Sequence, residues 1–150
     1  MSFSIRPAVP DDLDRIVLFN QALARETEGR ELERGILQKG VNKLLRDPDL
    51  GRYFVAEDGD EVVGQIAVTT EWSDWRNGPV WWIQSVYVSR QRRGEGIYRA
   101  LHEFVREMAR AEKAAGLRLY VERDNAVAQH TYLSLGMRES DYRMYEEIWS

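Results

Sequence analysis

The chain has 150 residues, of which 43% are hydrophobic and 31% charged, a composition typical of one folded domain spanning residues 1–150. It contains no cysteine, which excludes disulfides, thiolate metal sites and a cysteine nucleophile. A net charge of −4 disfavours nonspecific nucleic-acid binding and mildly favours a cationic ligand. We find neither a signal-peptide pattern nor a membrane-spanning segment, so we expect a cytoplasmic protein that binds no membrane.

The first half of the chain is predicted to hold a strand, two helices and a hairpin. Phe3–Arg6 alternates like a short strand, and Asp11 or Asp12 can cap a helix. Helical spacing follows at Leu13, Ile16, Val17, Asn20 and Leu23. A second helix is expected over Leu32–Arg46. The strands Arg52–Glu57 and Glu61–Thr70 are joined at Asp58-Gly59-Asp60, a strong hairpin signal.

The second half is predicted to alternate between strands and helices. A loop over Glu71–Pro79 precedes the strand Trp81–Val88, and Gly116 ends an amphipathic helix over Ile97–Ala115. The remaining expected elements are a parallel strand at Leu117–Val121, a short helix at Asn125–Leu135 and a final strand at Tyr142–Trp149. The order β-α-α-β-β-β-α-β-α-β predicts an α/β (α+β) fold with a mixed central sheet flanked by helices.

The most informative segment is the turn Gln91-Arg92-Arg93-Gly94-Glu95-Gly96, which joins the strand Trp81–Val88 to the following helix. Glycines let the backbone approach an anion, and a helix N-terminus offers unpaired N–H groups, so the turn suits a phosphate. Gly96 is followed by Ile97-Tyr98, which excludes a nucleotide-hydrolysing Walker loop, and a third glycine for a dinucleotide site is missing. On spacing alone, a plain strand–helix turn stays open.

With this turn directly after Val86-Tyr87-Val88, the chain resembles the GNAT superfamily of N-acetyltransferases, whose signature is Gln/Arg-x-x-Gly-x-Gly/Ala. A second match is Asn125-x-x-Ala128-x-x-x-Tyr132, followed by Leu135-Gly136-Met137. Ile5-Arg6-Pro7-Ala8 and Val63-Gly64 also look like the family, so the resemblance covers the whole chain. It implies the GNAT fold, a sheet of about six to seven strands, and acetyl transfer from acetyl-coenzyme A to an amine.

The resemblance also implies which residues bind the cofactor. Backbone N–H groups of the turn would hold the pyrophosphate, aided by the side chains of Arg92 and Arg93; the residues concerned are Gln91, Arg92, Arg93, Gly94, Glu95, Gly96, Ile97 and Tyr98. A bulge at Val86, Tyr87 and Val88 would free backbone groups to pair with pantetheine. Asn125 and Ala128 would adjoin the pantetheine arm. Tyr132 would protonate the departing thiolate. Tyr98 departs from the small residue that is usual in the family.

The acceptor side is less specific. Related polyamine acetyltransferases carry a glutamate at the position of Gln84, and a glutamine cannot serve as the base. Glu71 is our candidate catalytic base, with Asp74, Glu26 and Glu28 as alternatives. Trp72, Asp74, Trp75 and Gln84 are candidate substrate-binding residues, because aromatic rings and carboxylates suit a cationic amine. Solvated or packed surface residues are the competing interpretation for each of them.

We therefore predict an enzyme that transfers acetyl from acetyl-coenzyme A to a primary amine of a small molecule by direct attack in a ternary complex, without a metal. Loose similarity to spermidine/spermine N-acetyltransferases fits the aromatic stretch before the cofactor strand. The alternatives are a non-catalytic acyl-coenzyme A-binding module and a protein or peptide N-acetyltransferase. Family members are commonly homodimers, and we expect the aromatic C-terminal strand with Tyr142, Tyr145 and Trp149 to contribute.

Overall fold

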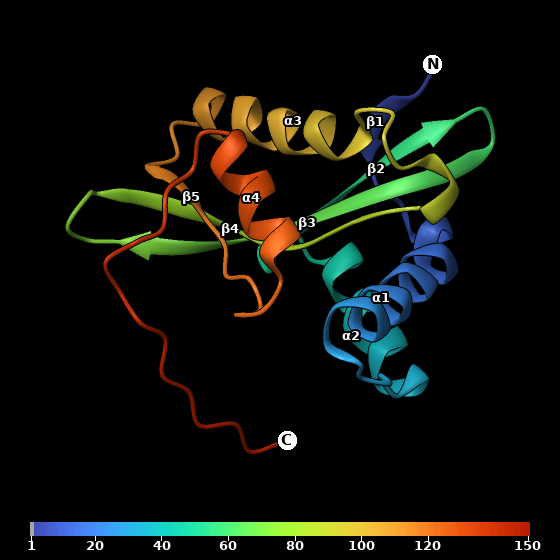
Figure 1. Ribbon diagram of the computed structural model, residues 1–150, viewed down its shortest axis with the longest axis horizontal. Helices are drawn as coiled ribbons and strands as arrows, with labels where there is room; N and C mark the ends of the chain where they lie inside the picture. Colours follow the sequence, from blue (N-terminus) through green and yellow to red (C-terminus); the bar gives the residue numbers. More distant parts are fainter. Residues whose placement is uncertain (1) are drawn as a thin grey trace. The chain divides into compact units, whose positions relative to one another are not determined.

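The computed structural model describes residues 2–150 and divides into two compact units, one ending at Tyr120 and the other spanning Val121–Ser150. The first unit contains a five-stranded sheet in the order β1-β2-β3-β4-β5. Neighbouring strands are antiparallel except β4 and β5, which are parallel. The strands are β1 (Ser4–Pro7), β2 (Arg52–Asp58), β3 (Glu61–Ser73), β4 (Gly78–Val88) and β5 (Gly116–Arg118) (Figure 1).

Helices cover both faces of this sheet. The first unit holds α1 (Leu13–Glu28), α2 (Arg34–Arg46) and α3 (Ile97–Ala111), together with 3₁₀ turns η1 (Pro10–Asp12) and η2 (Arg90–Arg92). Figure 1 shows α3 along one face of the sheet and α1 and α2 together on the other. The second unit contains α4 (Ala126–Ser134). The predicted element order is thus confirmed up to α4, with ends that differ by a few residues.

The alternation of apolar residues along the strands divides the core into two layers. On the α3 side, Phe54, Ile66 and Val86 pack against Ile97 and Leu101. On the opposite side, α1 and α2 bury a second set of side chains against the sheet: Ile16, Val17, Val41, Tyr53 and Ala67, with Phe19, Val55, Val62 and Tyr87 as a neighbouring cluster. Burial of apolar surface on both faces fixes which side of β4 looks toward which helix.

The entry into α1 differs from the prediction in its contacts. Asp12 immediately precedes the helix but makes no side-chain cap. Its carboxylate instead accepts hydrogen bonds from the Val9 N–H at 2.8 Å and from Arg6 at 2.9 Å, and Arg6 also pairs with Glu57 on β2. Burial of Asp12 acts to raise its pKa, but the hydrogen bonds from Arg6 and Val9 outweigh this effect and hold the pKa below its ordinary value. The cluster ties β1 to β2 and to the start of α1.

The predicted loop over Glu71–Pro79 is wrong. The ladder between β3 and β4 continues through the pairs Glu71↔Val80 and Ser73↔Gly78, which leaves only four residues for the turn, with Asn77 at a φ of 51°. Aromatic residues favour extended backbone, and here they extend the hairpin well beyond the point where the charged residues begin. Trp72 therefore lies on a strand, while Trp75 lies in the turn.

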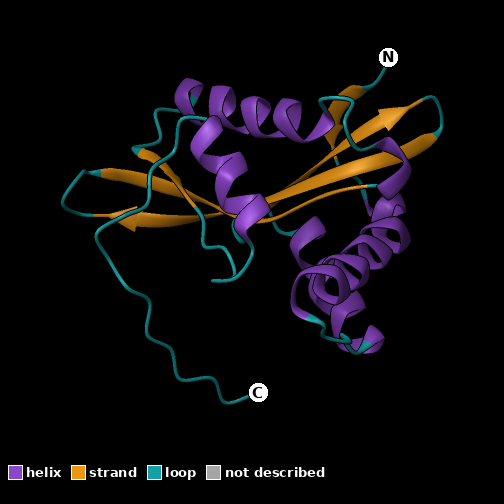
Figure 2. Cartoon of the chain, in the orientation of Figure 1, coloured by secondary structure: helices purple, strands orange, loops and turns teal. Residues whose placement is uncertain are grey.

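The predicted final strand at Tyr142–Trp149 is also wrong, and the sheet has five strands instead of six to seven. Within the second unit, Figure 2 shows residues 139–150 as a loop without helix or strand. The alternating aromatic pattern is compatible with a strand, but a strand also needs a partner, and no ladder includes this segment in residues 2–150. All side chains over residues 141–150 are exposed.

In the described part of the chain, no helix is both long enough and apolar enough to cross a membrane. Residues 2–150 also contain no group of three or more histidine, aspartate or glutamate side chains arranged to hold a metal ion.

Candidate active site

The glycine turn lies between the end of β4 at Val88 and the start of α3 at Ile97. Gly94 and Gly96 have φ values of 83° and 84°, the left-handed region that side chains other than glycine rarely adopt. Gly96 precedes the first residue of α3 without a side-chain cap, so the first N–H groups of the helix keep their capacity to bind an anion. A Cβ atom at Gly94 or Gly96 would meet no atom within 4 Å. The backbone here is therefore open to a ligand.

β4 changes its pairing just before the turn. The parallel ladder with β5 joins Val80–Trp82 to Gly116–Arg118 and ends there. Opposite β3, Ile83 and Ser85 pair with consecutive residues, so Gln84 is the extra residue of a bulge. The bulge therefore lies at Gln84, not at Val86–Val88 as the resemblance led us to expect. Beyond Trp82, no strand of residues 2–150 pairs with the β5 side of β4.

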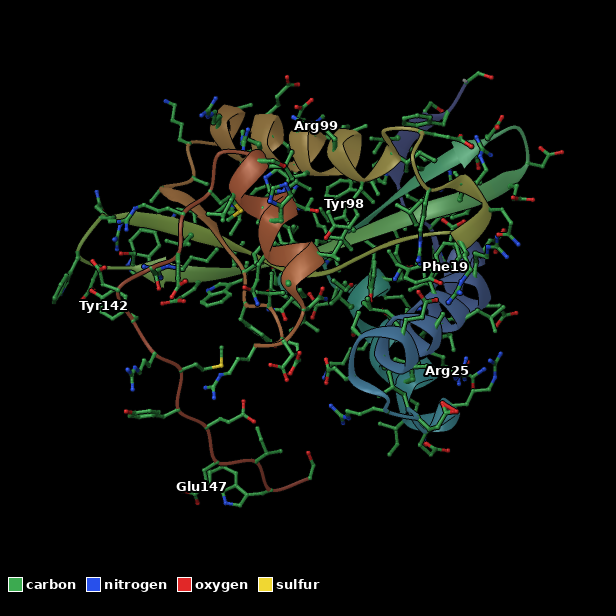
Figure 3. All side chains as sticks on the ribbon, viewed as in Figure 1. Phe19, Arg25, Tyr98, Arg99, Tyr142 and Glu147 are labelled. Carbon is green, nitrogen blue, oxygen red and sulfur yellow. The ribbon has the colours of Figure 1, made fainter. Side chains whose placement is uncertain are left out.

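Beyond the bulge, successive side chains of β4 point to opposite faces of the sheet. Val86 and Val88 pack in the α3-side core, while Tyr87 packs against Phe19 on the α1 side, with the two ring centres 5.1 Å apart. Figure 3 labels Phe19 on α1 and Tyr98 in the first turn of α3. The face toward α3 is therefore filled with apolar side chains, and polar groups at this edge gather on the α1 side.

The three arginines of the turn are each paired with carboxylates. Arg92 contacts Asp58 at 3.0 Å and Glu95 at 2.9 Å. Both Arg93 and Arg90 pair with Glu26 at the end of α1, at 2.9 and 3.5 Å. Each of these arginines therefore has a carboxylate partner within the first unit.

Glu26 joins three parts of the first unit. Besides the two arginines, its carboxylate accepts a hydrogen bond of 2.5 Å from the Tyr87 hydroxyl. Burial raises the pKa of Glu26, but the bonds from Tyr87 and Arg93 and the two arginine charges outweigh it, so the pKa lies below its ordinary value. Burial, and then Glu26 itself, raise the pKa of the Tyr87 hydroxyl. The glutamate is therefore ionised and the tyrosine protonated near neutral pH.

The candidate acceptor residues spread along the β3–β4 hairpin. The Gln84 amide donates to the Thr69 hydroxyl at 2.8 Å, and Glu71 accepts a hydrogen bond of 2.6 Å from the Trp82 indole. Trp72 is 62% exposed and Trp75 89% exposed, whereas Trp81 is buried in the core. Asp74 accepts a hydrogen bond from the Trp75 N–H within the turn. Glu71 and Gln84 thus lie on one hairpin without touching each other directly.

A buried polar network that joins α1 to β2 and β3 was missed by the sequence analysis. The Gln65 side chain is fully buried; its amide donates to Asn20 at 3.1 Å, and Asn20 donates to the Tyr53 hydroxyl at 3.1 Å. Burial raises the pKa of Tyr53 against the opposing effects of Asn20 and Ser85. The only signal in the sequence is one glutamine inside the apolar run Val62–Val68.

The second unit carries the other predicted cofactor residues. Asn125 precedes α4, and its side-chain oxygen caps the helix by accepting from the Ala128 N–H at 3.1 Å. The cap uses that oxygen, so its NH₂ group is the part suited to a further donor bond. Ala128 and Tyr132 lie on α4, one turn apart and half-buried. In the first unit, Tyr98 packs against the α3-side core, which accommodates the large ring next to the turn.

Comparisons with known proteins agree with this geometry. The chain is 33% identical over 138 residues to an uncharacterized N-acetyltransferase of Archaeoglobus fulgidus, covering 91% of this chain and 94% of that protein. It is 30% identical over 90 residues to a streptothricin acetyltransferase of Escherichia coli, covering 60% of this chain and 48% of that protein. The crystal structure of a possible acetyltransferase from Clostridium difficile 630 superposes with a TM-score of 0.94 at 48% identity, covering 100% and 99% of the two chains.

The family profile described as the acetyltransferase (GNAT) family matches residues 17–137. That span includes the bulged strand β4, the glycine turn and α4. The chain belongs to the GNAT acetyltransferase family.

Proposed function

We propose that this chain transfers an acetyl group from acetyl-coenzyme A to a primary amine of a small molecule, by direct attack within a ternary complex. One observation carries the proposal: the edge of β4 away from β3, which beyond Trp82 pairs with no strand of residues 2–150, leads into an open glycine turn at the start of α3. Such an arrangement can bind an extended amide-bearing arm and its phosphates in one continuous site. We also propose that residues 1–150 make up a single N-acetyltransferase domain.

Each part of the cofactor has candidate residues. The backbone N–H groups of Arg93–Tyr98 would bind the pyrophosphate, aided by the side chains of Arg92 and Arg93. The edge of β4 at Val86–Val88 would pair with pantetheine. A backbone N–H at Val86 or Tyr87 would stabilise the oxyanion that develops on the acetyl carbonyl. Acetyl-coenzyme A supplies an activated thioester. We assign Asn125 and Ala128 to the pantetheine arm, as the family resemblance implies.

On the acceptor side, Glu71 is the proposed base and Trp72, Asp74, Trp75 and Gln84 the proposed binding residues. The exposed tryptophans next to acidic side chains support a cationic amine as the acceptor. The relative that is a streptothricin acetyltransferase also supports a small-molecule acceptor. Because α3 fills the opposite face of the sheet, the amine would approach β4 from the α1 side.

One alternative has a specific observation in its favour. Gln84 stands at the bulge, and its amide donates to Thr69 and cannot take a proton from an amine. A module that binds acyl-coenzyme A without catalysis would need no base there. Release of free thiol from acetyl-coenzyme A, measured with a panel of polyamines, amino acids, aminoglycosides and peptides, separates the two functions. Acceptor-dependent thiol release with a small amine supports the enzyme; acceleration by peptides alone would favour a peptide acetyltransferase; binding without release would leave the non-catalytic module.

Tyr132 is the proposed acid that protonates the departing thiolate. Replacing it with phenylalanine keeps the ring but removes the proton, so turnover of Tyr132→Phe should fall about a hundredfold or more. The affinity for coenzyme A should stay nearly constant, because the hydroxyl acts on the leaving group. Steady-state kinetics and calorimetry on the same variant measure both quantities. Unchanged turnover would remove Tyr132 from this role.

We also propose a homodimer. Segment 139–150 exposes several large apolar side chains in the single chain, namely Tyr142, Met144, Tyr145, Ile148 and Trp149. Soluble single chains rarely expose so many within a short stretch, and contact with a second copy would bury them.

A further inference from the structure

The charges around the glycine turn are already neutralised within the first unit. A phosphate-binding turn would be expected to present its arginines to solvent, yet each of the three pairs with a carboxylate. Arg92 is held by Glu95 of the turn itself and by Asp58 of the neighbouring hairpin. Arg90 and Arg93 differ from Arg92 in that both pair with the same residue, Glu26. This residue lies at the end of α1, a helix that is distant from the turn in the sequence.

Contacts other than the one with Glu26 hold the Arg93 side chain in its position. Its Nε donates to the Val88 carbonyl at 3.1 Å, and its guanidinium lies 5.2 Å from the centre of the Tyr87 ring. Only one terminal nitrogen is used by the Glu26 carboxylate, at 2.9 Å. An anion that replaced this carboxylate would therefore meet a guanidinium that is already oriented.

Glu26 has the position and the charge of such an anion. Its two oxygens divide between the partners, one accepting from Arg93 and the other from the Tyr87 hydroxyl, with Arg90 near the second. A carboxylate and a phosphate compete for the same arginine donors, because both are anions with planar or tetrahedral sets of acceptor oxygens. A phosphate that takes the terminal nitrogen now bonded to Glu26 therefore displaces this carboxylate from Arg93.

We propose that Glu26 acts in the free protein as an internal competitor of the cofactor's phosphate groups, by occupying the guanidinium groups of Arg90 and Arg93 beside the phosphate-binding turn. This inference rests on the proposed function, since it assumes a phosphate-bearing ligand at the turn. Binding of the cofactor displaces the carboxylate from the arginines and leaves the end of α1 attached to β4 through the Tyr87 hydroxyl. Cofactor binding is thereby coupled to the helix on the side where the acceptor would approach.

The competition predicts an unusual direction for a conservative substitution. Glu26→Gln keeps an oxygen that can accept from Tyr87 but removes the negative charge, so coenzyme A should bind about three- to tenfold more tightly than to the wild type. A purely structural role for Glu26 would predict weaker binding, because the contact between α1 and the turn would be loosened. Calorimetric titration with coenzyme A at fixed ionic strength measures the difference.

Two further variants isolate the cause. Glu31→Gln removes the same charge close to the same end of α1, where Glu31 pairs with Arg25 at 3.1 Å, and it should leave the affinity unchanged. In an Arg93→Gln background, Glu26→Gln should give a much smaller gain, because the competition for that arginine is gone.

The possible results are distinct. No binding of coenzyme A to the wild type contradicts the proposed function itself. Normal binding to the wild type with equal or weaker binding to Glu26→Gln overturns the competition while leaving the function in place. An equal gain in Glu31→Gln would mean that general charge, not competition for these arginines, sets the affinity, and would also overturn it.

Discussion

The two glycines of the turn act through backbone conformation. At Gly94, the φ of 83° is costly for any residue with a Cβ atom, although the space around that position is open. Gly94→Ala should therefore destabilise the turn by about 1–2 kcal/mol through strain. The strained N–H groups would move away from the pyrophosphate, and we expect the dissociation constant for coenzyme A to rise about tenfold, as measured by calorimetry.

A matched glycine provides the control. Gly40 lies on the exposed side of α2, its φ is not positive, and an added Cβ would meet nothing within 4 Å. Gly40→Ala should raise the free energy of unfolding by up to about 1 kcal/mol, since alanine favours a helix over glycine, and should not change cofactor affinity. If Gly94→Ala bound coenzyme A like the wild type, the turn would not be the pyrophosphate site.

At the residue scale, the sequence could identify the backbone features of the site but not its ion pairs. The positions of Gly94 and Gly96 follow from a local requirement for positive φ, which a motif carries directly. The partner of Arg93 is Glu26, 67 residues away along the chain, and no local pattern encodes that contact. Glu26 was only one of several alternative bases, and the structure gives it a different set of neighbours.

At the scale of elements, α3 packs closely on β3 where Gly64 replaces a side chain. A Cβ atom at Gly64 would lie 3.1 Å from the Ile97 side chain, 3.2 Å from the Tyr87 carbonyl oxygen and 3.3 Å from Leu101. Gly64→Ala should therefore cost about 1–3 kcal/mol of stability through overpacking, measured by urea unfolding. Ile97 begins α3, so the same strain should weaken coenzyme A binding at the adjoining turn.

A second strand glycine separates crowding from the general cost of a substitution. A Cβ at Gly116, the first residue of β5, would meet nothing within 4 Å. Gly116→Ala should change stability by no more than about 0.5 kcal/mol. Equal stability of Gly64→Ala and the wild type would show that α3 can shift away from β3 without cost.

Elements held by local signals could be predicted, and elements that depend on pairing could not. Glycines mark the turn at Asp58–Asp60 and the start of the helix after Gly96, and both elements are confirmed. The bulge at Gln84 depends on the register between β3 and β4, and the ends of the hairpin depend on cross-strand pairs such as Glu71↔Val80. Because these contacts are long-range, the sequence analysis wrongly expected a loop over Glu71–Pro79 and a bulge at Val86–Val88.

At the scale of the whole molecule, the parallel step from β4 through α3 to β5 could be predicted, because a crossover helix of this length returns the chain to a neighbouring strand. The C-terminal strand could not be predicted correctly, since its apolar pattern shows that the segment can be buried but not by which partner. Tyr142, labelled in Figure 3, belongs to this segment and is largely exposed in the single chain.

The proposed homodimer gives this segment a test. Tyr145 and Trp149 are 90% and 89% exposed, so replacing both with serine removes little packing within the chain, and the midpoint of monomer unfolding should hardly change. If a second copy buries these rings, the wild type should have the mass of a dimer in light scattering after size exclusion, and the double variant that of a monomer at the same concentration. Leu18→Ser controls for the loss of surface hydrophobicity, because Leu18 is a half-exposed residue on α1, more than 120 residues before this segment in the sequence. This variant should remain dimeric. A wild type that stays monomeric at high concentration would contradict the dimer, and a double variant that stays dimeric would place the interface elsewhere.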